Sequence, residues 1–269
     1  MSESKIDILL KQCSSSESSQ VVEGVQELLD LKAYSAVPTI VALLSSADTV
    51  VRFTAAAALG YLGQLNPELV GKELVKLLVD SEAIIRAEAL DSLGILSYTA
   101  AIEPIMFLLE NDPDPLVRAS AAETLGDLGQ EEAITAIFAA LVDPDESVRA
   151  YAANSIGLLG TPTLLPKLAA HIKSESSLRV KAELLGARYR LGAKEDIHLF
   201  LDLLDNADED MATTLLNILA DLIDRKQPLY LSESSFSISE VLTKLSDIFP
   251  MLNPQVQGLI FQLKTIAQS

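Results

Sequence analysis

An arginine recurs at a nearly constant interval through the middle of the chain, and each copy holds the same place in a sixteen-residue pattern. The intervals are 34, 32, 31 and 30 residues, and the arginines are Arg52, Arg86, Arg118, Arg149 and Arg179. A self-similar period of roughly 30 residues marks a stacked array in which each repeat packs on its neighbours. The period alone restricts the fold to a repeat architecture.

The reference copy is DPLVRASAAETLGDLG, from Asp114 to Gly129. The other copies are DTVVRFTAAAALGYLG from Asp48, EAIIRAEALDSLGILS from Glu82, DESVRAYAANSIGLLG from Asp145 and ESSLRVKAELLGARYR from Glu175, which has a different second half. A shorter stretch precedes each copy, and its apolar residues recur at steps of three and four, the helical period. Each repeat is thus predicted to be an A helix, a turn and a B helix, which gives an all-α, right-handed solenoid of about seven helical hairpins with degenerate terminal repeats.

We expect a single solenoid over residues 1–269, divided into five parts by how well the pattern is kept. A degenerate first repeat would serve as a cap, since terminal repeats need a polar outer face. The predicted parts are an N-terminal cap repeat (1–34), five well-formed repeats (35–192), a degenerate repeat (193–225), an inserted loop (226–238) and a C-terminal cap hairpin (239–269).

An acid stands four residues before each arginine, where an N-cap side chain accepts orphan amides and stabilises a helix by about 0.5–2 kcal/mol. Ser81 and Ser174 precede the two glutamates of this set and are alternative caps. Each arginine is expected to reach an acid of its own or the adjacent repeat, which would form a ladder of partly buried charges. The predicted ladder is Asp48, Arg52, Glu82, Arg86, Asp114, Arg118, Asp145, Arg149, Glu175 and Arg179.

Small and apolar residues of the B helices predict the seam between layers. An alanine follows each arginine by three residues, and a leucine or isoleucine follows four of the arginines by seven. The interior glycines Gly60, Gly94, Gly126 and Gly157 each cost about 1 kcal/mol relative to alanine, so we expect close backbone contact there. Gly63, Gly129 and Gly160 are expected to end their helices in the left-handed conformation, with Ser97 as the exception.

Composition excludes several classes of function. The net charge of −18 disfavours nucleic acid and anionic membrane surfaces, because both draw on Lys and Arg. It leaves two uses for the charge, solubility or a partner with a basic patch. The single cysteine, Cys13, permits no internal disulfide, and no apolar run approaches the roughly 20 residues of a spanning helix. A cytoplasmic protein without a membrane insertion is the expectation.

The pattern D-x-x-x-V-R-x-x-A-A-x-x-L-G-x-L-G after an A-x-P-x-L-x-x-L-L helix resembles HEAT repeats of the phycobilisome-lyase type. The resemblance is strong from about Ala36 to Arg190 and weak at both ends. It implies kinship with subunits of E/F-type bilin lyases, which attach linear tetrapyrroles to phycobiliprotein cysteines, or with non-lyase adaptors. The motif is specific for the repeat class and poorly specific for activity.

No catalytic or metal constellation stands out. Deoxyhypusine hydroxylase carries iron on HEAT-like repeats through paired His-Glu motifs, but the two histidines here, His171 and His198, are followed by Ile172 and Leu199. Cys13 has no matched histidine that would make it a nucleophile. No phosphate-binding G-x-x-x-x-G-K-[ST] occurs. We therefore expect no catalytic residue, no metal and no cofactor.

What remains is a surface on the B helices. Because the core uses steps 0, 3, 7 and 10 from the arginine, steps 2, 5 and 9 should face the inside of the curve. A merely solvated face is the competing interpretation. The candidate partner-binding residues are Tyr61, Glu88, Asp91, Ile95, Glu123, Asp127, Tyr151, Asn154, Leu158 and Arg188.

The sequence favours a non-catalytic scaffold, adaptor or assembly chaperone in a cyanobacterial phycobilisome or cofactor-assembly context. Its partner would be another protein with a basic or amphipathic helical surface, bound on the acidic concave face. The alternative is a subunit of an E/F-type bilin lyase, and only that alternative involves a bilin.

Overall fold

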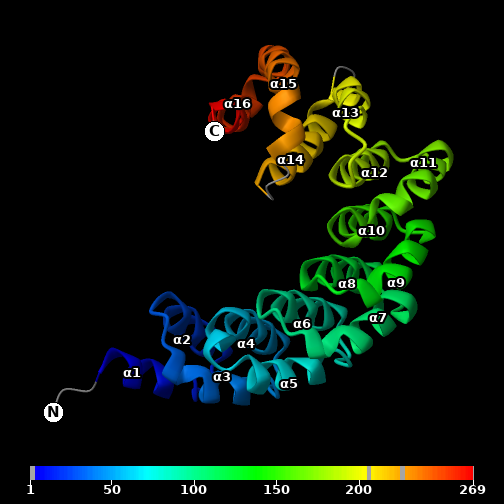
Figure 1. The fold of residues 1–269 in the computed structure, drawn as a ribbon. Coiled ribbons are helices and arrows are strands. Elements are labelled where there is room, and N and C mark those ends of the chain that lie inside the picture. The colour runs from blue at the N-terminus through cyan, green and yellow to red at the C-terminus, as the bar shows by residue number, and fades with distance from the viewer. Residues whose placement is uncertain (1–3, 205–206, 225–227, 269) are drawn as a thin grey trace. The chain divides into compact units, whose positions relative to one another are not determined.

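The structure is a computed structural model that describes residues 4–204, 207–224 and 228–268 (Figure 1). The described residues form helices joined by short turns and contain no strand, so the predicted all-α fold is confirmed. The chain separates into two compact units, Met1–Ala140 and Leu141–Ser269. Short 3-10 turns occupy Tyr34–Ala36, Gly63–Leu65, Thr99–Ala101, Glu131–Ala133, Ala140–Val142, Pro162–Leu164 and Pro250–Leu252.

Unit 1 is a row of helical hairpins. Its helices are α1 (Lys5–Gln12), α2 (Ser18–Asp30), α3 (Val37–Leu43), α4 (Thr49–Leu62), α5 (Pro67–Leu77), α6 (Ala83–Ile95), α7 (Ile102–Asn111), α8 (Pro115–Leu128) and α9 (Ile134–Ala139). The B helices α2, α4, α6 and α8 pack in sequence, and α3, α5 and α7 each pack on the B helix that follows (Figure 1). This is the predicted A–B alternation.

Unit 2 continues the alternation and ends in two long helices. Its helices are α10 (Glu146–Leu159), α11 (Leu165–Ser174), α12 (Leu178–Arg190), α13 (Asp196–Leu204), α14 (Glu209–Asp224), α15 (Pro228–Ile248) and α16 (Asn253–Gln268). The B helices α10, α12 and α14 are again neighbours, and α15 packs against α16.

The predicted loop over residues 226–238 is wrong where the structure describes it. Residues 226–227 lie outside the described residues, but helix α15 begins at Pro228 and runs without a break to Ile248. Proline favours the first helical position, and no glycine or further proline interrupts the segment. Its serines lower helix propensity by only a few tenths of a kcal/mol each, which tertiary packing readily offsets.

The predicted seam is buried. Each alanine three residues after an arginine has no exposed surface, nor do the aliphatic residues one turn later in the first four copies. These residues are Ala55, Ala89, Ala121, Ala152, Ala182, Leu59, Leu93, Leu125 and Ile156. Full burial of one such leucine contributes roughly 1.5–3 kcal/mol, so the seam is the main source of cohesion between repeats. In unit 2 a second cluster around Tyr189, Phe200 and Leu242 joins the last helices to α12.

The acids before the arginines divide into two groups. The side chains of Asp48, Asp114 and Asp145 accept amides of the first turns of α4, α8 and α10, as predicted. Glu82 stands at the N-cap of α6 without a side-chain cap, and α12 is capped by Ser177, which accepts from the Val180 amide at 3.2 Å. Capping by Ser81 or Ser174 is therefore wrong.

The arginines form a ladder, but mostly with acids other than those predicted. Arg52 Nε donates to Asp80 Oδ2 at 2.9 Å, and Arg86 Nε donates to Asp112 Oδ2 at 2.7 Å. Each of these aspartates stands two residues before the predicted acid, in the turn that ends the next A helix. Within the described part of the chain, the predicted acid Glu175 takes part, accepting from Arg149 Nε at 2.9 Å.

The same guanidinium groups also tie down the turns of their own repeats. Arg86 Nη1 donates to the carbonyl oxygens of Asp80 and Ser81, and Arg118 Nη1 donates equivalently to those of Asp112 and Pro113. The ladder aspartates in turn accept an amide two residues on, as in Asp112 Oδ1 with Asp114 N at 2.9 Å. One arginine therefore fixes two turns, its own and that of the next repeat.

Only some of the interior glycines are required by close approach. A Cβ at Gly157 would lie 2.8 Å from Ala187 Cα, whereas one at Gly94 would meet nothing closer than Thr124 Cγ2 at 3.5 Å. The expected cap conformations are also partly wrong, since Gly129 is left-handed but Gly63 and Gly160 are not. Ser97, the expected exception, is left-handed with φ +53.

We predict opposite effects for two glycine-to-alanine substitutions. Gly157→Ala should lower the free energy of unfolding by about 1–3 kcal/mol, because the added methyl meets the backbone of α12. Gly94→Ala should raise it by up to about 1 kcal/mol, because a helix-interior glycine is replaced where the added methyl makes only ordinary van der Waals contact with Thr124. Urea unfolding followed by circular dichroism measures both, and equal signs would contradict the packing described for Gly157.

Candidate functional site

Four of the predicted groove residues come together around one hollow in unit 1. Asp91 and Ile95 of α6 and Glu123 and Asp127 of α8 line it, together with Gly94, Ser97 and Thr124. The hollow has a volume of about 500 Å³. Each pair of residues is one helical turn apart, so neighbouring B helices present them toward the same side. Among the described residues that line this hollow, none is a lysine or an arginine.

Burial and neighbouring charge together disfavour the ionised form of two carboxyl groups in and beside this acidic hollow. Burial raises the pKa of Glu88 to about 7, and the nearby Asp91 carboxylate adds to the shift. Partial loss of solvent likewise raises the pKa of Asp91, to which the charge of Asp127 contributes. Glu88 is half-buried, and its Oε1 accepts a long hydrogen bond of 3.4 Å from Ser92 Oγ. An approaching cation would relieve this repulsion.

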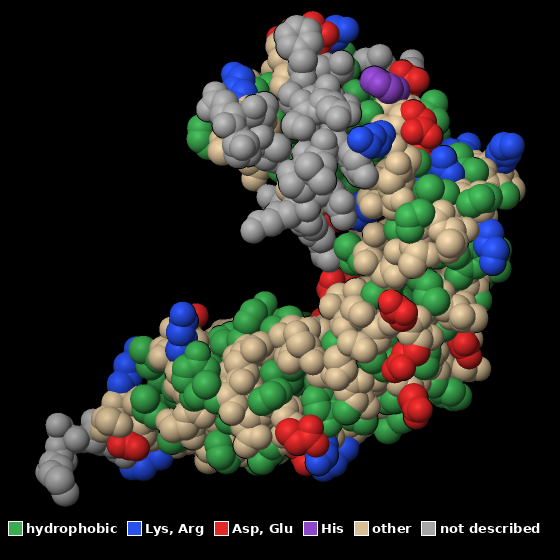
Figure 2. Space-filling view, viewed as in Figure 1, with side chains coloured by type: hydrophobic (Ala, Val, Ile, Leu, Met, Phe, Trp, Pro, Cys, Tyr) green, Lys and Arg blue, Asp and Glu red, His purple; other side chains and the backbone are tan. Residues whose placement is uncertain are grey.

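Tyr61 lies in a separate, more apolar hollow of unit 1. Leu29, Lys32 and Tyr34 of the α2 end and Leu62 of α4 line it with Tyr61, around a volume of about 420 Å³. The Tyr61 side chain is 57% exposed, which leaves its ring available for contact. In the space-filling view apolar and neutral side chains dominate over α2, α4 and α6, whereas acidic ones gather over α7, α8 and α9 (Figure 2).

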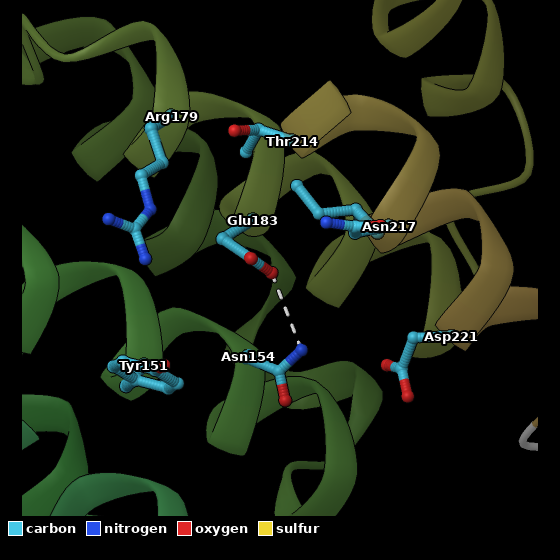
Figure 3. Close-up of a pocket in the computed structure, with 8 residues that line it drawn as sticks. Tyr151, Asn154, Arg179, Glu183, Thr214, Asn217 and Asp221 are labelled. Carbon is cyan, nitrogen blue, oxygen red and sulfur yellow. Dashed lines mark hydrogen bonds between the residues drawn. The ribbon is translucent and has the colours of Figure 1, made fainter. Parts of the chain in front are cut away.

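Tyr151 and Asn154 of α10 line a polar pocket in unit 2. Its other lining residues are Arg179 and Glu183 of α12 and Thr214, Asn217, Ile218 and Asp221 of α14 (Figure 3). Arg179, predicted as a ladder arginine, instead lines this pocket, and its Nη1 lies 3.5 Å from Ser147 Oγ. Glu183 and the three polar residues of α14 were not predicted from the sequence.

Arg188 does not lie in the groove. Its guanidinium is paired with Asp196 and donates to the carbonyl oxygen of Leu165, at the start of α11, so the prediction for this residue is wrong. The cause is Asp196, the first residue of α13, an acid that the degenerate repeat places outside the repeated pattern. Leu158 is half-buried on α10 and lines none of these hollows.

Comparison with protein families gives matches to HEAT repeats over residues 6–94, 71–141 and 134–220. These matches together cover most of the chain. The protein is a HEAT-repeat protein.

Two solved structures are similar to this chain in fold. The complex of CpcE and CpcF of phycocyanin lyase from Nostoc sp. PCC7120 is similar with a TM-score of 0.61 and 20% identity, over 86% of this chain and 94% of that chain. YibA of E. coli is similar with a TM-score of 0.54 and 18% identity, over 96% of this chain and 92% of that chain. A search of curated proteins gave no match.

Two searches of the described residues of this HEAT-repeat protein were negative. No described helix has both the length and the apolar character needed to cross a bilayer. Within the same residues, no three His, Cys, Asp or Glu side chains are arranged so that they could hold a metal ion.

We predict that Glu88→Gln stabilises the HEAT-repeat protein at high pH only. The folded-state pKa of Glu88 lies near 7, above the 4.5 of an unperturbed glutamate, so the folded form binds more protons between these values. Stability then falls as the pH rises from about 4.5 to 7, and the neutral amide removes this loss. Thermal unfolding should show a higher midpoint for the variant at pH 8 and no difference at pH 4. A constant difference at both pH values would contradict this assignment.

Proposed function

We propose that this HEAT-repeat protein is a non-catalytic scaffold, adaptor or assembly chaperone that binds a partner protein on the B helices of unit 1. The observation that carries the proposal is the acidic hollow, where Asp91, Glu123 and Asp127 converge from two neighbouring helices. Concave faces built from successive repeats are the usual binding surfaces of solenoids.

The electrostatics of the hollow favour a basic partner. Burial raises the pKa values of Glu88 and Asp91, and neighbouring carboxylates add to the shift, so the free protein carries a local cost that a cation would offset. Charge complementarity of this kind gives specificity and a fast association rate more than it gives raw affinity.

The apolar hollow around Tyr61, at the other end of unit 1, offers a contact surface for apolar side chains of such a partner. Exposed aromatic side chains, here Tyr34 and Tyr61, are favoured anchors at protein interfaces. The B helices α2, α4, α6 and α8 are sequential neighbours, so both hollows belong to one row of helices. An amphipathic helix with an apolar end and a basic end fits this combination.

A subunit of an E/F-type bilin lyase is the second candidate, and the fold likeness to the CpcE and CpcF complex favours it. The propionates of a bilin are best held by Arg or Lys. Arg188, the single basic residue predicted for the groove, is instead bound by Asp196 and Leu165. The adaptor function is therefore preferred, and a phycobilisome or cofactor-assembly setting in a cyanobacterium, like location in the cytoplasm, is part of the proposal.

The experiment is affinity capture from native lysate with three forms of the protein. The groove form carries Asp91→Lys, Glu123→Lys and Asp127→Lys, and the control carries Glu103→Lys, Glu110→Lys and Glu131→Lys. The control acids are exposed on α7 or just before α9, so both forms change the net charge equally. We expect recovery of the wild-type partner to fall about tenfold or more with the groove form only. It should also weaken with added salt, since exposed charges are screened.

Equal recovery by all three forms would reject the acidic hollow as the binding surface. Co-expression with a phycobiliprotein subunit and a bilin source separates the second candidate. Covalent chromophore that appears only when this chain is present would favour the lyase subunit over the adaptor.

A further inference from the structure

The polar pocket of unit 2 is assigned no part in the proposed function. It lies between three successive B helices, α10, α12 and α14, and has a volume of about 230 Å³ (Figure 3). Pockets for drug-sized ligands typically measure about 300–1,000 Å³, so this one suits a smaller molecule.

Glu183 stands where the other copies have a buried apolar residue. The corresponding positions, four residues after the arginine, are Ala56, Leu90, Ala122 and Ala153, all without exposed surface. A carboxyl at such a position loses hydration and needs hydrogen bonds in return. Among the described residues it receives one, a long bond of 3.4 Å from Asn154 Nδ2 to Oε2. Burial accordingly raises the pKa of Glu183 to about 7.

Arg179 also departs from its counterparts. Arg52, Arg86 and Arg149 each hold a carboxylate of the next repeat with two nitrogens. Within the described part of the chain, Arg179 makes one hydrogen bond, at 3.5 Å to Ser147 Oγ, and no ion pair. Its guanidinium thus retains most of its donors on the pocket side of α12.

Arg179 and Glu183 are one turn apart on α12 yet form no ion pair in the structure. Arginine and glutamate at this spacing commonly pair on a helix surface. In Figure 3 Glu183 lies between Arg179 on one side and Asn217 on the other, with Thr214 above it. Asp221 at the far end is already paired with Arg190. The pocket therefore offers one positive and one negative group, separated by space and surrounded by neutral polar side chains.

We infer that this pocket binds a small zwitterion of the α-amino acid class, with its carboxylate on Arg179 and its ammonium group on Glu183. A ligand with only a positive charge would face Arg179, and one with only a negative charge would face Glu183. A guanidinium is well matched to a carboxylate, which it can hold with two parallel hydrogen bonds. The inference is independent of the groove in unit 1.

Isothermal titration calorimetry with a panel of free amino acids tests the inference on the full-length protein. At least one small member should bind, and its amide and its N-acetyl derivative, which each lack one charge, should bind at least about tenfold more weakly. Arg179→Gln and Glu183→Gln should weaken binding by a similar factor. Lys181→Gln on α12 and Glu240→Gln on α15 are matched controls that should bind as the wild type does.

Two further readouts separate binding from folding. Thermal unfolding without ligand should show that Glu183→Gln is folded and no less stable than the wild type at pH 8. Binding to the wild type should weaken as the pH falls from 8 to 6, since an ammonium group needs the ionised carboxylate, and the Gln variant should lose this dependence. Arg179, Arg190 and Asp221 are the charged groups that act on Glu183.

The inference would be overturned if no amino acid in the panel binds the wild type. It would also be overturned if the singly charged derivatives bind as well as the parent, or if the Arg179 and Glu183 variants bind unchanged.

Discussion

The guanidinium groups that link one repeat to the next set the geometry on which the rest of the structure depends. Arg86 shows the arrangement: two of its nitrogens hold Asp112 of the following repeat, and a third holds the turn carbonyls of its own repeat. The side chains of Arg86 and Asp112 are 11% and 3% exposed. A buried pair of this kind adds little net stability over an apolar pair, but losing one partner is costly. The ladder therefore acts chiefly by fixing how each turn sits on the next.

Because the ladder fixes the turns, the B helices are aligned with one another. Residues that differ between the repeat copies are thereby brought together on neighbouring B helices. Asp91 and Asp127 stand on different helices, yet the shared register places them on one hollow. In the terminal repeat of unit 1 the arginine is missing, and Ser18 Oγ donates to Asp48 at 2.6 Å instead. A short neutral side chain thus replaces the charged link between the first repeat and the next one.

Features that depend on the period alone could be predicted from the sequence. The seam and the convergence of Asp91, Ile95, Glu123 and Asp127 follow from helical spacing and were expected. The acid that pairs with each arginine was not predicted. Its position depends on where the A helix of the next repeat ends, two residues before the N-cap of the following B helix. Backbone conformation at the helix ends could not be predicted either, since Ser97 is left-handed and Gly63 is not. Helix α15 was missed because a serine-rich sequence is only a weak helix breaker.

The core positions of the repeat copies point to the polar pocket, whereas the exposed groove positions do not. A charged residue in a repeated core position, here Glu183 among alanines and a leucine, is more informative than variation on an exposed face. The pocket beside Glu183 also needs the polar residues of α14. These residues belong to a repeat that is too degenerate to align with the other copies. The same repeat architecture thus carries surfaces of different chemistry in the two units. Unit 1 has an acidic hollow, and unit 2 has a pocket of mixed charge.

The most direct test of this account is a double-mutant cycle across the ladder. Urea unfolding is measured for the wild type, Arg86→Ala, Asp112→Ala and the double variant. Each single change should cost about 3–5 kcal/mol, and the double variant should cost less than their sum by at least about 1 kcal/mol. The exposed pair of Glu68 and Lys72 serves as the reference cycle, and its coupling should be smaller, because exposed ion pairs are screened by solvent. Additive effects of Arg86 and Asp112, or coupling no larger than in the exposed pair, would contradict the central place given to the ladder.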